Sequence, residues 1–221
     1  MYKYLLRNAD AVCFDVDSTI SVHEGIDELA KWCGVSVSKS TQQAMNHRSV
    51  SFRDSLRNRL NIIRPSRQDI ESYLQHNPPV FNHGVHEIVD VLRKRNMDVY
   101  LVSGGFRPMI TPFAEALSIP IDTHVFANTF LFDQDGSYLG FDTNEMTSQP
   151  FRGKVDVIRA IQQNDHHQNI IMIGDGSTDL ETKGVASLFI GYGGVHVREL
   201  VQKESDWFVT DFQEITNAFL Y

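Results

Sequence analysis

The sequence predicts an α/β fold, in which helices flank a Rossmann-like parallel sheet core and a small helical cap is inserted after the first strand. Short apolar runs recur along the chain, and stretches with helical periodicity separate several of them, as in a parallel sheet wound with helices. Residues 21–80 interrupt this alternation, because they carry apolar stripes at helical spacing and no convincing strand. We therefore expect residues 1–20 and 81–221 to form the core and residues 21–80 to form the cap domain.

The first predicted strand is Ala11–Val16, an apolar run whose lack of polar alternation is typical of a central strand covered on both faces. Four further runs are predicted to be strands: Met97–Val102, Ile170–Ile173, Leu188–Ile190 and Trp207–Val209. The segment 125–142 differs, because two β-type runs flank Asp135-Gly136, which is the commonest short hairpin signal.

Two helices are predicted inside the insertion from apolar residues that recur every three or four positions. Their stripes are formed by Ile26, Leu29, Ala30 and Cys33, and by Phe52, Leu56, Leu60 and Ile63. Pro78-Pro79 marks the expected exit from the insertion, and Asn82-His83-Gly84 is expected to open the next helix.

The composition is that of an ordinary globular protein. With 20 basic and 28 acidic residues, the net charge of -8 disfavours nucleic acid or an anionic membrane as a partner, so an anionic substrate needs a local basic pocket. Cys13 and Cys33 have no CxxC partner and are expected to be reduced packing residues. The N-terminal segment lacks a signal-peptide pattern and no window resembles a membrane span, so we expect a soluble cytoplasmic protein.

Four polar groups are predicted to lie just after strands, at the edge where open parallel sheets bind their ligands. They are Asp15-Val16-Asp17-Ser18-Thr19, Ser103-Gly104-Gly105, Lys154 and Asp175-Gly176-Ser177-Thr178-Asp179. Each group is weak evidence by itself, since an Asp-Gly pair also fits a plain turn followed by a capped helix. Their shared placement at strand ends predicts that they converge in one crevice.

The chemistry of these groups fits a phosphate site that holds a metal. Carboxylates that converge in one crevice repel each other, and their ionised forms coexist only beside a cation. All-oxygen ligands in the presence of phosphate suit Mg²⁺. Ser103 offers a hydroxyl, Gly104 and Gly105 offer backbone amides, and Lys154 offers a positive charge, and all of these bind phosphate.

These four groups resemble the four motifs of the haloacid dehalogenase superfamily, and the resemblance covers nearly the whole chain. Within the superfamily, Asp15–Cys33, Leu101–Arg107 and Ile170–Gly176 are similar to the phosphoserine phosphatase family of eukaryotes and bacteria. The resemblance implies a Mg²⁺-dependent hydrolase that releases phosphate from O-phospho-L-serine, the last step of serine biosynthesis. Its partner is then a small-molecule substrate, and whether the protein is a monomer or a homodimer stays open.

The resemblance also implies a role for each motif residue. Asp15 attacks phosphorus and forms an aspartyl phosphate, while Asp17 protonates the leaving oxygen and later activates water. Mg²⁺ is held by the Asp15 carboxylate, the Asp17 main-chain carbonyl and Asp175, and Asp179 steadies its water shell. The implied phosphate ligands are Ser103, Gly104, Gly105, Lys154 and Thr178.

Substrate choice is expected to reside in the cap, which would close over the crevice and exclude water. By position in the family pattern, Glu24 binds the ammonium and Arg59 the carboxylate of phosphoserine. Met45 and Phe52 are implied to form apolar walls around the substrate.

Alternatives remain open at this point. Arg53 and Arg57 stand close to Arg59 in sequence and compete for its role. The chain departs from the family in residues 46–51, where a longer segment replaces a pair of glycines and changes the expected shape of the cap loop. The rival functions are a phosphatase or phosphotransferase of the same fold for another small phosphomonoester, and a phospho-acceptor module with slow turnover, which Asp17 disfavours.

Overall fold

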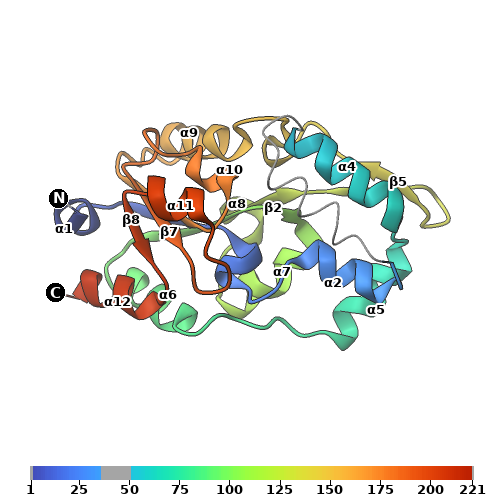
Figure 1. The fold of residues 1–221 in the computed structure, drawn as a ribbon, viewed down its shortest axis with the longest axis horizontal. Helices are drawn as coiled ribbons and strands as arrows, with labels where there is room; N and C mark the ends of the chain where they lie inside the picture. Colours follow the sequence, from blue (N-terminus) through green and yellow to red (C-terminus); the bar gives the residue numbers. More distant parts are fainter. Residues whose placement is uncertain (1, 36–50, 221) are drawn as a thin grey trace.

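The computed structural model describes residues 2–35 and 51–220, and its core is a six-stranded parallel sheet (Figure 1). The strands lie in the order β3-β2-β1-β6-β7-β8. Their bounds are Ala11–Phe14 (β1), Asp98–Phe106 (β2), Val125–Asn128 (β3), Ile170–Gly174 (β6), Leu188–Tyr192 (β7) and Trp207–Val209 (β8). The parallel sheet confirms the predicted α/β fold.

Strand β1 lies in the interior of the sheet, between β2 and β6, and all four of its side chains are buried. Successive side chains of a strand point to opposite faces. Val12 and Phe14 accordingly pack in one apolar cluster, and Ala11 and Cys13 pack in the other. This two-sided burial is the reason that the run shows no polar alternation in sequence.

Helices cover both faces of the sheet (Figure 1). The face that carries Phe14 packs against α6 (Val85–Lys94), α7 (Arg107–Ala116) and α12 (Phe212–Leu220), and the opposite face packs against α9 (Gly153–Asn164) and α11 (Glu199–Glu204). Shorter helices are α1 (Tyr2–Arg7), α8 (Ile121–His124) and α10 (Ser177–Leu180). Across the part of the chain that the structure describes, none of the helices has the length and apolar character needed to cross a membrane.

The cap contains helices and no strand within residues 21–35 and 51–80. Its helices are α2 (Gly25–Trp32), α4 (Phe52–Ile63) and α5 (Arg67–His76). Ser51 caps the start of α4, because its hydroxyl accepts a hydrogen bond from the Asp54 amide at 3.1 Å. Leu29, Leu56 and Leu60 of the predicted stripes are buried, which confirms the two helices predicted from them.

A two-stranded hairpin from a later part of the chain packs on the cap helices. Strands β4 (Phe130–Phe132) and β5 (Tyr138–Phe141) pair antiparallel, and Gly136 takes the positive φ of +86° in the turn between them. Phe130 shares an apolar cluster with Leu60 of α4, and Figure 1 shows β5 beside α4 at the end of the molecule that carries the cap helices. Two separate stretches of sequence therefore cover this end of the sheet.

The structure corrects several of the strand predictions. Strand β1 ends at Phe14, two residues before the predicted end at Val16, because a helical turn begins at Val16. The strand predicted at 97–102 continues as β2 to Phe106, because the backbone stays extended through the glycine pair and meets β3 again opposite Asn128. The segment 125–142 supplies the predicted hairpin and also β3, whose largely buried side chains let it join the edge of the main sheet.

Candidate active site

The site lies at the carboxyl edge of the sheet, where neighbouring strands end. Asp15 follows β1 and Asp175 follows β6, while Ser103, Gly104 and Gly105 lie in the last part of β2. These strands are adjacent in the sheet, with β1 between the other two. The fold therefore brings three of the four predicted groups to one place, as expected for an open parallel sheet.

Three buried carboxyl groups face one another at this edge. One oxygen from each of Asp15, Asp175 and Asp179 lies within 4.8 Å of the others. Asp179 is held in place by the Gly176 amide, which donates to its Oδ2 at 2.9 Å. A side chain at Gly174 would collide with Asp179, so the end of β6 needs glycine to let this carboxyl group approach.

Lys154 lies between two of these carboxylates. Its Nζ is 2.8 Å from Asp15 Oδ1 and 2.6 Å from Asp179 Oδ1. The prediction that it follows a strand was wrong, because it sits in the first turn of α9. Burial opposes the charge of this amine, but Asp15 and Asp179 raise the pKa of Lys154, so it stays protonated.

The carboxylate cluster has more negative charge than its side-chain partners offset. Burial, followed by the nearby Asp15, raises the pKa of Asp175 to about 7. The same two causes raise the pKa of Asp179 well above its ordinary value. A hard divalent cation among the oxygens would relieve this repulsion, and carboxylates are ligands that such ions prefer. The residues present therefore fit a divalent metal held by Asp15 and Asp175, with Asp179 beside it.

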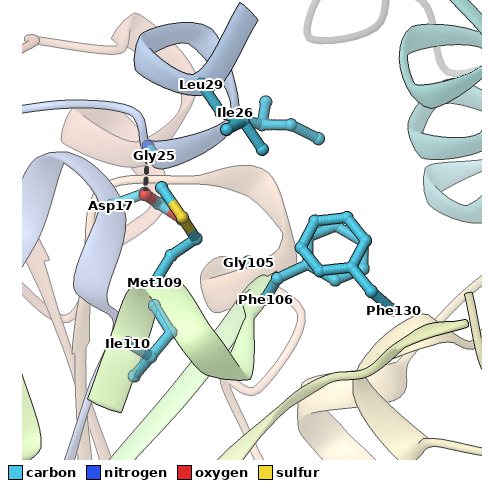
Figure 2. Close-up of a pocket in the computed structure, with 9 residues that line it drawn as sticks. All are labelled: Asp17, Gly25, Ile26, Leu29, Gly105, Phe106, Met109, Ile110 and Phe130. Carbon is cyan, nitrogen blue, oxygen red and sulfur yellow. Dashed lines mark hydrogen bonds between the residues drawn. The ribbon is translucent and has the colours of Figure 1, made fainter. Parts of the chain in front are cut away.

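Asp17 lines a small pocket between the start of α2 and the end of β2 (Figure 2). The Gly25 amide donates to Asp17 Oδ1 at 2.6 Å, and the Ser103 hydroxyl donates to its Oδ2 at 3.5 Å. Burial, followed by the charges of Glu24 and Asp15, raises the pKa of Asp17 to about 8. This carboxyl group is thus mostly protonated at neutral pH, which suits a general acid.

The Ser103-Gly104-Gly105 segment is fixed by its own hydrogen bonds. The Gly105 amide donates to Ser103 Oγ at 2.9 Å, so it orients the hydroxyl that was predicted to bind phosphate. The Asn128 side chain donates from Nδ2 to the Gly104 carbonyl at 2.7 Å. A Cβ atom at Gly104 would lie 2.6 Å from the ring of Phe52, which shows that the cap residue lies directly on this segment.

Glu24 and Arg198 bind each other at the cap side of the cluster. Glu24 Oε1 accepts from Ser18 Oγ at 2.8 Å and pairs with Arg198 Nη2 at 3.4 Å. Arg198 also donates from Nε to Asp175 Oδ2 at 2.8 Å. Arg198 was not among the residues predicted from the sequence, although it follows the glycine-rich turn at the carboxyl end of β7, the same kind of position as the predicted residues.

The three neighbouring arginines of α4 have different environments. The Arg59 side chain is 11% exposed and pairs with Asp27 of α2, while its Nε has no hydrogen-bond partner among the described residues. Arg57 is 46% exposed and pairs with Asp54 on the same helix. Arg53 is bound to core loop atoms. Arg59 is therefore the arginine that lies inside the cap.

Two predicted residues add little to this geometry. Met45 lies outside the described residues. Thr178 is half-buried in α10, next to Asp179 in the chain.

Known proteins with similar sequence and structure provide a comparison. The model of the haloacid dehalogenase-like hydrolase family matches residues 12–182. The chain is 45% identical to phosphoserine phosphatase of Bos taurus over 98% of this chain and 96% of that protein. It is 46% identical to the chloroplastic phosphoserine phosphatase of Arabidopsis thaliana over 97% of this chain and 73% of that protein. A solved phosphoserine phosphohydrolase-like protein from Francisella tularensis has a TM-score of 0.82 at 29% identity, over 94% of this chain and 98% of that one.

We expect divalent metal binding to release protons at neutral pH. The raised pKa of about 7 keeps Asp175 partly protonated near pH 7 in the metal-free protein, and the pKa of Asp179 is raised as well, whereas a metal binds the ionised carboxylates. Metal affinity should consequently rise as the pH increases through about 7. Calorimetric titration of MgCl₂ in two buffers with different ionisation enthalpies measures the proton release. Equal heats in both buffers would contradict this explanation, and Asp175→Asn should abolish the signal.

Proposed function

The chain belongs to the haloacid dehalogenase-like hydrolase family, and we propose that it is a phosphatase that converts O-phospho-L-serine to L-serine and phosphate. The observation that carries the proposal is the 45% identity to a phosphoserine phosphatase over 98% of this chain, cap and core together. The reaction is the last step of serine biosynthesis, and a cytoplasmic location belongs to the same proposal. A homodimer remains a prediction.

Asp15 acts as the nucleophile of this reaction. Its carboxylate attacks phosphorus, the bond from phosphorus to the serine oxygen breaks, and an aspartyl phosphate forms. The Lys154 ammonium lies 2.8 Å from Asp15 Oδ1 and supports this role, because its positive charge offsets the negative charge of the buried carboxylate.

Asp17 acts as the general acid and then as the general base of this reaction. Its raised pKa of about 8 supports the role of general acid, because the group holds a proton that can pass to the leaving serine oxygen. The resulting carboxylate then takes a proton from the water that attacks the aspartyl phosphate. The oxygen–phosphorus bond of the intermediate breaks in that step, and Asp15 returns to its starting form.

Positive charge and hydrogen-bond donors stabilise the transferring phosphoryl group. Lys154 and the Ser103 hydroxyl are the proposed side-chain ligands, with the Gly104 amide and Thr178 completing the set. Gly105 supports the group indirectly, because its amide holds the Ser103 hydroxyl at 2.9 Å. We take Mg²⁺ as the ion of the carboxylate cluster, where it would supply charge that offsets the phosphate oxygens.

The cap recognises the amino-acid part of the substrate. Glu24 is proposed to bind the ammonium, and Arg59 the carboxylate, with Phe52 as an apolar wall. The two charged groups come from different parts of the cap, since Glu24 directly precedes α2 and Arg59 lies in α4. The buried Nε of Arg59, which has no hydrogen-bond partner within residues 2–35 and 51–220, supports this assignment, because a buried donor requires an acceptor.

We expect Asp15→Asn to lower kcat by at least about three orders of magnitude while leaving the fold intact. Asparagine keeps the shape of the side chain but cannot form the acyl phosphate. Phosphate release from O-phospho-L-serine measures the loss, and circular dichroism checks the fold. Asp156→Asn, at an exposed position of α9, is the matched control and should keep wild-type turnover. Retained activity in the Asp15 variant would exclude the covalent route.

A substrate series tests the recognition of phosphoserine. O-phosphoethanolamine lacks the carboxylate, and glycerol 3-phosphate lacks both the carboxylate and the ammonium. Wild-type kcat/KM should be highest for O-phospho-L-serine. Glu24→Gln should lower kcat/KM about tenfold or more for substrates with an ammonium, and Arg59→Gln should do so only for the substrate with a carboxylate.

Arg57→Gln is the control for this series, because Arg57 is exposed and pairs within its own helix. It should leave the whole series unchanged. Equal wild-type rates on O-phospho-L-serine and on sugar phosphates would overturn the assignment and favour a phosphatase of broader substrate range.

A further inference from the structure

We propose that Arg53 is a positioning residue that fastens the start of α4 to the core and thereby holds the Phe52 ring on Gly104. This inference rests on the proposed function, in which Gly104 binds the phosphoryl group. It assigns a role to the arginine that sequence considerations had left as a competitor for substrate binding.

Arg53 donates three hydrogen bonds to a single core segment, residues 143–150. Its Nε donates to the Ser148 carbonyl at 2.9 Å, and its Nη2 donates to the Thr143 carbonyl at 2.9 Å. The same Nη2 also donates to Gln149 Oε1 at 3.0 Å. Hydrogen bonds from a charged donor are stronger than neutral ones, and three acceptors together fix the plane of the guanidinium.

The residue before Arg53 is held by the same segment. The Phe52 amide donates to the Pro150 carbonyl at 3.2 Å. Phe52 is the first residue of α4, so contacts that hold the first turn of this helix also hold the backbone from which the Phe52 ring extends. The ring lies so close to Gly104 that a Cβ atom there would be 2.6 Å from the ring. A shift of the first turn therefore lifts the ring away from the phosphate segment.

The same core segment also holds Gly104 from the side of the sheet. Thr147 Oγ1 donates to Asn128 Oδ1 at 2.7 Å, and Asn128 Nδ2 donates to the Gly104 carbonyl at 2.7 Å. Both side chains are buried. Residues 143–150 thus reach Gly104 by two routes, through Thr147 and Asn128 in the core and through Arg53 and the Phe52 ring in the cap.

The neighbouring arginines do not share this arrangement. Arg57, one turn further along α4, forms its ion pair with Asp54 of the same helix and is 46% exposed. Arg59 pairs with Asp27 of α2. In the part of the chain that the structure describes, Arg53 is the one of these three residues that forms hydrogen bonds to residues 143–150. Arg57 is consequently a control with the same charge and the same helix.

Loss of the Arg53 contacts should weaken the binding of substrate and phosphate more than it slows the catalytic step. Arg53 contacts neither Asp15 nor Asp17 through any of these hydrogen bonds, so the groups that react stay in place. Without these contacts, a smaller fraction of the protein molecules would have the Phe52 ring placed on Gly104. The apparent affinity for substrate falls in proportion to that fraction. KM should therefore rise while kcat changes little.

The experiment compares Arg53→Gln, Arg53→Lys and Arg57→Gln in the full chain with MgCl₂ present. For Arg53→Gln we expect KM for O-phospho-L-serine, and the inhibition constant of inorganic phosphate, to rise by about tenfold. Arg53→Lys should recover only part of this loss, since an ammonium cannot reach all three acceptors with a planar fork. Arg57→Gln should stay within about twofold of wild type for both constants.

Two measurements separate positioning from a general loss of structure. Hydrogen exchange of the amides at the start of α4 should accelerate in Arg53→Gln and not in Arg57→Gln, while amides of β1 stay protected in both. Thr147→Val should weaken phosphate binding as well, and Thr147→Ser, which keeps the hydroxyl, should restore it. Unchanged phosphate binding in Arg53→Gln, or an equal loss in Arg57→Gln, would overturn the proposal.

Calorimetric binding of inorganic phosphate keeps this test independent of the substrate assignment. If wild-type protein fails to hydrolyse O-phospho-L-serine but phosphate affinity still falls in Arg53→Gln, the substrate assignment is wrong and the role of Arg53 stands. If the substrate is hydrolysed and phosphate affinity does not change, the role of Arg53 is wrong and the function stands.

Discussion

The repulsion among Asp15, Asp175 and Asp179, which are buried with carboxyl oxygens within 4.8 Å of one another, is the constraint on which the rest of this site depends. Carboxylates this close are stable in ionised form only when cations surround them. Lys154 lies between Asp15 and Asp179, and Arg198 binds Asp175 from another direction. The raised pKa values that persist in spite of these partners explain why the cluster fits a divalent metal. The positive charges of Lys154 and Arg198 are thus held in place by the negative charges of these carboxylates.

The parallel sheet makes this crowding geometrically feasible. Neighbouring parallel strands end at the same edge of the sheet, so the side chains that follow them lie close together without long connecting loops. Glycine residues then allow neighbouring backbone and side chains to approach most closely, because they have no Cβ atom. Gly174 leaves space for the Asp179 carboxyl group, and Gly153 lets the start of α9, which carries Lys154, lie against the Met146 carbonyl. Strand ends and helix starts therefore hold these polar side chains close together.

The cap has a different physical task from the core. Its helices rest on an apolar cluster shared with the hairpin of β4 and β5, so the roof of the site is built from two distant parts of the sequence. Polar contacts then tie this roof to the catalytic edge. Arg53 links α4 to residues 143–150, and Glu24 links the start of α2 to Arg198. The helices of the cap are consequently joined to the carboxyl edge of the sheet through Arg53 and Glu24.

Features that follow from local sequence pattern could be predicted before the structure was known. The uninterrupted apolar run at β1 predicted a central strand, and the positions of Asp15, Asp17, Asp175 and Asp179 after apolar runs predicted a shared crevice. The tertiary structure alone decided which polar groups reach one another across elements. It placed Lys154 in the first turn of a helix, brought Arg198 to Asp175, and gave the arginines of α4 different partners. Such contacts depend on how one helix is rotated against another element, and that rotation is set by packing of the whole chain, which no short stretch of sequence specifies.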